Sequence, residues 1–434
     1  MANKHTAARR ALVDPKLRRR LLATVAFTLF LDLAGFGIIL PVLPLYAKSM
    51  GVGAIVVAWL STAFSLAQFV MSPVLGAWSD RYGRRPVMLT SIAGSVAANL
   101  VLGVSMNIFF VFGARLVAGA SKANVSTAYA YVADMVEPED RAKYMGMMGA
   151  ALGMGFVVGP AIGGLLSTPE MPTLPFFVSA GLSLVNLIMA WLWLPETRFL
   201  RDEEGDAERR KTHIRPGPLE LIKSVQGTLL GRLILVNFLF FSAFAAMEST
   251  FALYNEAIFG WLEKETGIYL TYVGVVMVIV QGGIIGRLVS KVGESRTMVT
   301  GVAVNMVGLF VMGVLPIVAQ QRGLALTTED GGMTWVSAVT LGVGGLGLAV
   351  GNGFLNATMG AIISQISNKD EQGVNMGVRE SAGALARICG PLVAGPIFAF
   401  VHPGAPMILG ALFGLANLYL LAGLVKKLRE RGVR

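Results

Sequence analysis

Charged side chains are scarce in this sequence. Asp, Glu, Lys and Arg supply 14% of its 434 residues, whereas a soluble protein carries roughly a quarter. Cysteine is scarcer still, since the single Cys389 excludes an intramolecular disulfide and a thiolate metal cluster. The three histidines, His5, His213 and His402, fall in a terminus, a linker and a connection. No buried histidine metal site is therefore expected.

Phosphate-binding signals are also missing. The chain has no G-x-x-x-x-G-K-[ST] loop, which argues against an ATP-driven pump. The string GVGGLGLAVG lies inside an apolar run rather than after a strand, so it does not indicate a dinucleotide site. We expect no enzymatic activity and no cofactor, with a proton gradient as the energy source.

Hydrophobic residues make up 54% of the chain, and apolar runs of about 20 residues, the length that spans a bilayer core as a helix, recur from end to end. The fold class that follows is an all-α integral membrane protein with twelve transmembrane helices. The expected spans are 21–46, 54–78, 86–105, 107–133, 142–167, 173–194, 230–257, 268–290, 297–318, 334–363, 372–400 and 404–425.

Polar segments divide these helices into two groups of six. The predicted parts are an N-terminal arm (1–20), a first bundle (21–194), a linker (195–228), a second bundle (229–425) and a tail (426–434). Within the linker, residues 218–225 are expected to form an amphipathic surface helix.

Lysine and arginine set the expected orientation. The connections of one side hold only Lys48, Lys264 and Arg322, whereas the arm, the linker, the tail and the remaining connections hold most of the others. Because cytoplasmic loops carry the excess of these residues, we expect a multi-pass protein of the inner (plasma) membrane with both termini in the cytoplasm. The net charge of +10 then indicates topology and contact with membrane lipids, not nucleic-acid binding.

An internal repeat supports two related halves. Gly76, Asp80, Arg81 and Gly83 recur 210 residues later as Gly286, Ser290, Lys291 and Gly293. The pair Gly159-Pro160 in the fifth expected helix is echoed by Gly390-Pro391 in the eleventh. Two parallel six-helix pseudo-repeats are typical of transporters that bind substrate between their halves near the bilayer midplane.

Several motifs resemble those of the major facilitator superfamily, and in particular its twelve-helix drug:proton antiporters of the tetracycline-efflux type. GAWSDRYGRRP at 76–86 resembles the loop signature of the superfamily, and GMGFVVGPAIGG resembles the antiporter motif of helix five. FLDLAGFGIILPVLPLY, RLVAG, LPETR and LARICGPLVAG resemble further family segments. The resemblance covers nearly the whole chain and implies the major facilitator fold and export.

The resemblance also implies roles for individual residues. Arg115, in RLVAG, would take part in proton transfer beside Asp32. Asp80 would dock near Gly373 at the start of helix eleven, and Arg84 would pair with Asp134, so that the loop acts as a latch between the two halves. The latch residues are Gly76, Asp80, Arg81, Gly83, Arg84, Asp134 and Gly373, and those of the antiporter motif are Gly155, Gly159, Pro160 and Gly163.

Charges inside the expected helices are the strongest functional candidates, because an ionisable group within a bilayer is costly unless it is paired, hydrated or protonated. Asp32 lies well inside the first helix, where burial disfavours its charged form and would let it exchange protons. A structural pairing of Asp32 with a buried arginine is the alternative. Lys122 would hold an anionic group of the substrate, or would pair with Asp32 or with Glu248.

Other polar and aromatic residues are expected to line a central cavity. In helix four, Arg115, Lys122, Ser126 and Tyr129 share one helical face. In helix seven, Glu248 lies among phenylalanines, which suits a cationic or aromatic ligand, although such a stripe also occurs in plain packing. Glu380 and Arg387 of helix eleven share a face and would either pair or, for the deeper Arg387, line the cavity. The cavity candidates are Gln68, Lys122, Tyr129, Phe244, Gln281, Asn352, Asn356 and Arg387, and the proton-coupling candidates are Asp32, Arg115 and Glu248.

The sequence thus predicts a secondary active transporter, monomeric, that exchanges protons for a lipophilic or amphipathic small molecule by alternating access. A lipid or glycolipid flippase of the same fold is a close rival, suggested by the additional buried cations. A membrane receptor or scaffold that transports nothing is a second rival, and it would have little need for charges inside the membrane.

Overall fold

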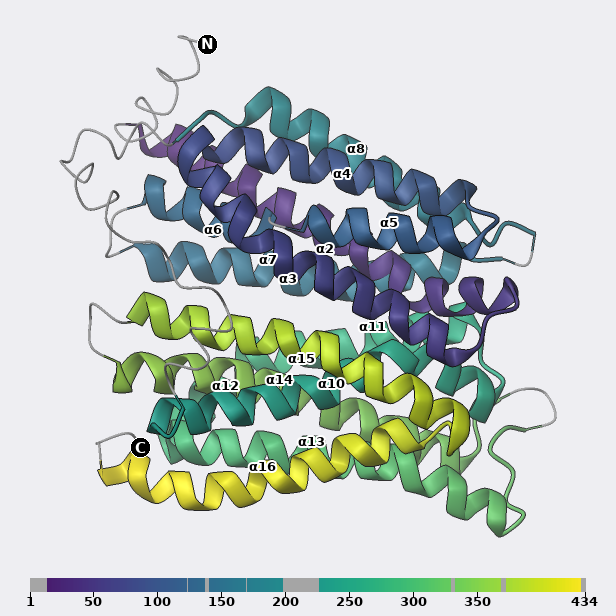
Figure 1. Cartoon of the computed structure of the whole chain (residues 1–434). Helices are drawn as coiled ribbons and strands as arrows, with labels where there is room; N and C mark the ends of the chain where they lie inside the picture. Colours follow the sequence, from purple (N-terminus) through teal and green to yellow (C-terminus); the bar gives the residue numbers. More distant parts are fainter. Residues whose placement is uncertain are drawn as a thin grey trace. The chain divides into compact units, whose positions relative to one another are not determined.

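The computed structural model describes residues 14–122, 124–136, 140–168, 170–197, 226–328, 332–367 and 372–430 (Figure 1). Within these ranges the regular structure is helical, apart from two isolated bridges, Thr168 with Met171 and Thr327 with Met333. Eleven helices are long and apolar enough to cross a membrane, and Ile108–Ala120 is a shorter apolar helix. The chain therefore has the twelve-span helical fold that its hydropathy predicts.

The helices of the first half are α2 (Pro15–Ser49), α3 (Ala54–Tyr82), α4 (Arg84–Val104), α5 (Ile108–Ala120), α6 (Asn124–Met135), α7 (Arg141–Leu166) and α8 (Leu174–Trp193). Those of the second half are α10 (Leu229–Phe259), α11 (Glu263–Ile279), the π-helix η2 (Val280–Ile284), α12 (Ile285–Val292), α13 (Glu294–Gln321), α14 (Trp335–Ile366), α15 (Gln372–Phe400) and α16 (Ala405–Glu430). Most ends fall within a few residues of the expected spans.

Two expected spans are interrupted. The span 107–133 divides into α5 and α6, because the backbone leaves the helix at Ser121, whose N–H still bonds to Val117 O and Gly119 O. The prediction of one continuous face from Arg115 to Tyr129 is therefore wrong. The span 268–290 contains the π-helix η2, with the sequence VQGGI. Such single-turn π segments are frequent at functional sites.

The chain divides into two compact units. One contains Met1–Leu43 and Leu66–Arg215, and the other contains Pro44–Ser65 and Pro216–Arg434. The end of α2 and the start of α3 thus belong with the second half of the sequence, which differs from a division of the chain at its linker. The bundles 21–194 and 229–425 stay a prediction.

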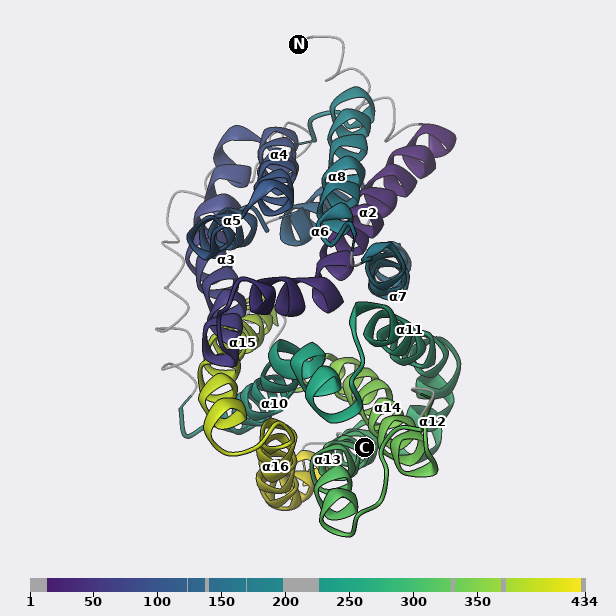
Figure 2. The same ribbon diagram turned by 90° about the vertical axis from the view of Figure 1, so that its right-hand side faces the viewer.

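The first unit packs around α4, which lies along α8 and also contacts α5 and α6 (Figures 1 and 2). Its core contains Leu22 and Leu29 of α2, Met88 of α4, Tyr131 of α6 and Met148 of α7, all fully buried. Side chains from these four helices thereby close one apolar interior.

Glycines bring α7 against the backbone of α2. A methyl group added at Gly155 would lie 2.7 Å from Phe30 O, and one at Gly159 would lie 2.5 Å from Ala34 O. One at Gly163 would overlap Ile38 O. This four-residue spacing places three glycines on one face, and helices in membranes approach this closely where small residues meet.

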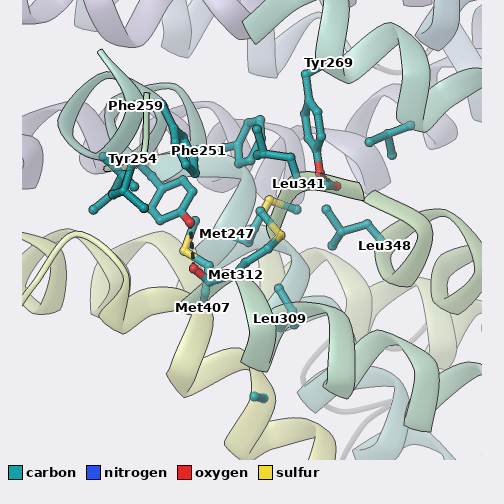
Figure 3. Close-up of a cluster of buried hydrophobic side chains, with 14 of the residues drawn as sticks. Met247, Phe251, Tyr254, Phe259, Tyr269, Leu309, Met312, Leu341, Leu348 and Met407 are labelled. Carbon is teal, nitrogen blue, oxygen red and sulfur yellow. Dashed lines mark hydrogen bonds between the residues drawn. The ribbon is translucent and has the colours of Figure 1, made fainter. Parts of the chain in front are cut away.

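The second unit has a core of aromatic and sulfur-containing side chains (Figure 3). Phe251 stacks on Tyr269 with ring centroids 5.2 Å apart. The Tyr254 hydroxyl donates to Met312 O at 2.6 Å, and the Tyr269 hydroxyl donates to Leu341 O at 3.0 Å. Phe251, one of the phenylalanines of the expected helix-seven stripe, therefore serves packing.

The internal repeat appears in the backbone. Gly83, between α3 and α4, has φ 112°, and Gly293, between α12 and α13, has φ 86°. Residues other than glycine rarely adopt these angles. Gly390 of α15 meets Ser242 O and Ala246 N of α10, much as Gly155 of α7 meets Phe30 O and Ala34 N of α2. In each half the fifth span therefore packs on the first through a glycine.

Some expectations fall outside the described residues. They are the amphipathic helix at 218–225, most of the linker, the first thirteen residues of the arm and the last four of the tail.

Candidate functional site

A buried ion pair lies inside the first unit. Asp32 of α2 accepts a hydrogen bond from Lys122 Nζ, with 2.7 Å between Nζ and Asp32 Oδ2. The Asp32 side chain is 5% exposed and that of Lys122 is 12% exposed. Lys122 Nζ also lies 3.4 Å from Asp32 O and 5.5 Å from the centre of the Phe36 ring. The two charges thus compensate each other within a membrane-spanning part of the protein.

The break between α5 and α6 positions this lysine. Lys122 belongs to the turn that follows Ser121, and its N–H bonds to Gly119 O. In one of its predicted alternatives Lys122 pairs with Asp32, and the structure contains that pair. The sequence pattern did not reveal that the lysine stands in a turn between two helices rather than on a helix face.

The partner of the Asp32 carboxylate is Lys122, whereas the family resemblance implied Arg115. Arg115 lies in α5 and is 5% exposed. Its part in proton transfer stays a prediction.

The loop motif forms a second charged network in the first unit. Arg84 Nη1 lies 2.7 Å from Asp80 Oδ1, and Arg84 Nε lies 3.2 Å from Asp134 Oδ2. Arg84 Nη1 also donates to Ser79 Oγ at 2.9 Å. The guanidinium thereby joins the end of α3 to the end of α6. Arg81 lies over the Tyr82 ring, with 5.3 Å from Cζ to the ring centre.

Glu196, in LPETR, is a part of this network that the sequence did not assign. Its carboxylate accepts the backbone N–H groups of Arg84 at 2.9 Å and of Arg85 at 3.1 Å, the first residues of α4. A carboxylate is favourable at a helix N-terminus because the first N–H groups have no partner within the helix. A methyl group at Gly83 would overlap this carboxylate and displace it from these N–H groups, and the positive φ of Gly83 also favours glycine there.

A polar cluster lies between α10, α14 and α15 in the second unit. Asn356 Nδ2 donates to Asn352 O at 3.1 Å and to Asn352 Oδ1. Asn356 Oδ1 accepts from Arg379 Nη2 at 2.9 Å, and Asn237 Nδ2 donates to Arg379 O at 3.3 Å. The expected residues Asn352 and Asn356 are thus joined, and they hold Arg379, which was not among the candidates.

The other cavity candidates of each unit are partly open. Gln68 of α3 and Tyr129 of α6 are half-buried in the first unit, and Phe244, Glu248 and Arg387 are half-buried in the second. Gln281 lies exposed in η2. Within the described residues Glu380 and Arg387 form no ion pair, so that predicted pairing is wrong. The exposed position of Glu380 explains this, since water or lipid headgroups can solvate its carboxylate.

One expected contact lies between the two units. The contact of Asp80 with the N-terminal end of α15, near Gly373, would join the two units and stays a prediction. In the described part of the chain, no group of three or more His, Cys, Asp or Glu side chains is arranged to hold a metal ion.

Comparison with known proteins gives consistent results. The profile of the Major Facilitator Superfamily matches residues 25–352. The tetracycline resistance protein, class C, of Escherichia coli is 29% identical over 87% of this chain and 89% of its own length. The class G protein of Vibrio anguillarum is 31% identical over 83% and 86%. The crystal structure of the human organic anion transporter MFSD10 is 24% identical, with a TM-score of 0.65 over 93% of this chain and 99% of that one.

Proposed function

Because this chain belongs to the major facilitator superfamily, we propose that it is a proton-coupled antiporter that exports a lipophilic or amphipathic small molecule by alternating access. Membership of the family and similarity to the resistance proteins indicate a multi-pass secondary transporter and not an enzyme. Tetracycline is the first substrate to test, because two of these relatives are named tetracycline resistance proteins.

The observation that carries the proposal is the Asp32–Lys122 pair. Breaking a buried ion pair by removing one charge leaves the other uncompensated, at a cost of about 3–5 kcal/mol. Protonation of Asp32 removes one charge in this way and releases Lys122 Nζ from the 2.7 Å contact. A proton thereby changes the electrostatic state of α2 and of the α5–α6 turn together.

Coupling follows if the two states of this pair favour different conformations. With Asp32 ionised, its carboxylate can accept a hydrogen bond from the substrate beside Lys122; with Asp32 protonated, that acceptor is weakened and the substrate is released. Proton and substrate would then exclude each other at one pair of side chains, as antiport requires. A ligand shifts a conformational equilibrium only through such a difference in affinity between states.

The loop network of Asp80, Arg84, Asp134 and Glu196 would act as the latch. Its arginine already joins α3 to α6, and Asp80, which is 44% exposed, would offer its carboxylate to the helix N-terminus near Gly373 in the outward-facing state. Such an anion is favoured there by the helix dipole. The protein would work as a monomer in the inner membrane, with both termini cytoplasmic and no cofactor.

The test is transport in proteoliposomes. Protein reconstituted with an imposed pH gradient should accumulate tetracycline in the wild type, and Asp32→Asn should lose the dependence on the gradient. Asn keeps the size of the side chain and its hydrogen bonding but cannot take up a proton. Glu256→Gln is the matched control, because Glu256 also contacts a lysine at 2.7 Å, Lys48 Nζ, but in a more exposed setting.

Glu256→Gln should keep the gradient dependence even if the rate changes. Full gradient dependence in Asp32→Asn would refute the coupling role. Tetracycline transport with no response to any pH gradient in the wild type would refute proton antiport altogether.

A further inference from the structure

Two arginines of α15 lie in its membrane-spanning part without a carboxylate partner. Within the described residues, neither Arg379 nor Arg387 forms an ion pair, and Glu380, the adjacent acid, is exposed. We propose that Arg379, Arg387 and the amide of Asn237 form an oxyanion-binding site over Gly383, which recognises a carboxylate or enolate group of the substrate. This inference rests on the proposed transport function and names the class of its substrate.

The buried cations of the two units differ in how their charge is compensated. In the first unit, the buried cation Lys122 has Asp32 at 2.7 Å. In the second unit, the Arg379 guanidinium donates to the Asn356 amide, and its Nε atom is buried with no hydrogen-bond partner. The acid that acts on it electrostatically, the adjacent Glu380, is exposed and forms no ion pair with it. A cation inside a membrane protein normally has a compensating anion or a functional role. An anionic ligand would supply the missing charge.

The guanidinium of Arg379 is held in place before any ligand binds. Asn356 Nδ2 is engaged by Asn352, and this fixes the orientation in which Asn356 Oδ1 accepts from Arg379 Nη2. On the α14 side, Gly360 leaves room, since a methyl group there would lie 3.2 Å from Arg379 Nη1. The donors are therefore preorganised, which lowers the entropy lost on binding.

The second arginine lies two turns further along α15. Arg379, Gly383 and Arg387 are spaced by four residues and share one face of α15. A methyl group built at Gly383 would lie 3.7 Å from Asn237 Nδ2 and 4.0 Å from Arg387 Nη1. Amide and guanidinium donors thus border the volume above this glycine, which is wide enough for an added atom.

The chemistry of the donors selects the ligand. Guanidinium groups bind planar oxyanions through two parallel N–H donors, a geometry that suits carboxylates and enolates. Apolar side chains of the same helices, Phe241 and Met376, are partly buried nearby in the adjoining apolar cluster. The expected substrate is therefore an amphipathic molecule with one acidic oxygen group, and not a plain cation.

A matched pair of probes tests this inference in detergent. Equilibrium binding of 9-anthracenecarboxylate and of the neutral 9-anthracenemethanol is measured by fluorescence at fixed pH and ionic strength. The wild type should bind the carboxylate about tenfold more tightly than the alcohol, because hydrogen bonds to a charged group contribute that much. Arg379→Gln and Arg387→Gln should each remove this preference, while Arg322→Gln, in a connection of the same unit, should keep it.

Gly383→Ala is a second test that leaves every charge in place. The nearest atoms to the added methyl are at ordinary contact distance, so the melting temperature should not change, whereas carboxylate affinity should fall severalfold. Equal affinity for the two probes in the wild type, no binding of the carboxylate, or unchanged carboxylate binding in Gly383→Ala would each overturn the proposal.

These measurements involve no gradient, so they are independent of proton coupling. Carboxylate preference together with gradient-independent transport would refute the antiport proposal and leave the anion site standing. Gradient-driven transport without carboxylate preference would refute the anion site and leave the antiport proposal standing.

Discussion

At the residue scale, the proposed function depends on which buried charges compensate each other. Asp32 and Lys122 form a buried pair at 2.7 Å, whereas the Arg379 guanidinium donates to the amide oxygen of Asn356 and forms no ion pair within the described residues. The sequence identified Asp32 and Lys122 as intramembrane charges and left the partner of Lys122 open. It overlooked Arg379 because nothing in a linear pattern tells a paired arginine from an uncompensated one.

The ion pair should be visible in stability. Asp32→Asn and Lys122→Met should each lower the unfolding free energy in detergent by about 3–5 kcal/mol, because each leaves one buried charge uncompensated. The double variant should cost less than the sum of the two, and this coupling is measured in a double-mutant cycle. Additive losses would mean that the two side chains do not compensate each other.

The glycines of the loop motif should differ in their tolerance of alanine. Gly83 has φ 112° and faces the Glu196 carboxylate, so Gly83→Ala should destabilise the protein by about 1–3 kcal/mol. Gly76 has open space around it and lies within helix α3, so Gly76→Ala should be neutral or slightly stabilising. Thermal unfolding of the two variants measures this difference, and equal losses of stability would contradict the role assigned to Glu196.

At the element scale, the helices followed from hydropathy because a bilayer requires every backbone group of a span to bond within its own helix. Hydropathy did not predict the interruption between α5 and α6, nor did it predict the π-helix η2. Both stretches are as apolar as regular helix, and what distinguishes them is local hydrogen bonding around Ser121 and within VQGGI. The helix-five motif, in contrast, gave the correct glycines but not their partner, the backbone of α2.

The contact between α7 and α2 should be sensitive at defined positions. Gly159→Ala should destabilise the protein by about 1–3 kcal/mol, since its methyl would lie 2.5 Å from Ala34 O. Gly149→Ala on the same helix is the control, because no atom lies within 4 Å of its methyl position. Melting temperatures in detergent would reveal the difference, and similar values for both variants would argue against close packing.

At the scale of the whole molecule, the repeat was visible in the sequence as an offset of 210 residues, and the structure repeats the positive φ of Gly83 at Gly293. The halves nevertheless differ in chemistry. The first carries the compensated pair and the acidic loop motif, whereas the second has Ser290 in place of the acid and an uncompensated arginine. The proposed proton-coupling pair therefore lies in the first half and the proposed oxyanion site in the second.

The latch makes a prediction for the transport cycle. Asp80→Asn should lower the transport rate severalfold and leave substrate affinity nearly unchanged, because the carboxylate lies at the end of α3 and belongs to neither proposed binding site. In its ion pair with Arg84 the Asp80 side chain is 44% exposed, so the pair should contribute about 1 kcal/mol to stability. Rate and affinity are measured separately in proteoliposomes and in detergent, and an equal loss of both would count against a latch.

Proton release on substrate binding is the most direct test of Asp32 as the proton-exchanging residue. Calorimetric titration of the purified protein in buffers of different ionisation enthalpy counts the protons exchanged, using tetracycline or a ligand found by thermal stabilisation. Substrate binding should release protons from the wild type, and Asp32→Asn should bind the same ligand without proton exchange. An unchanged proton count in Asp32→Asn would contradict the assignment of coupling to the Asp32–Lys122 pair.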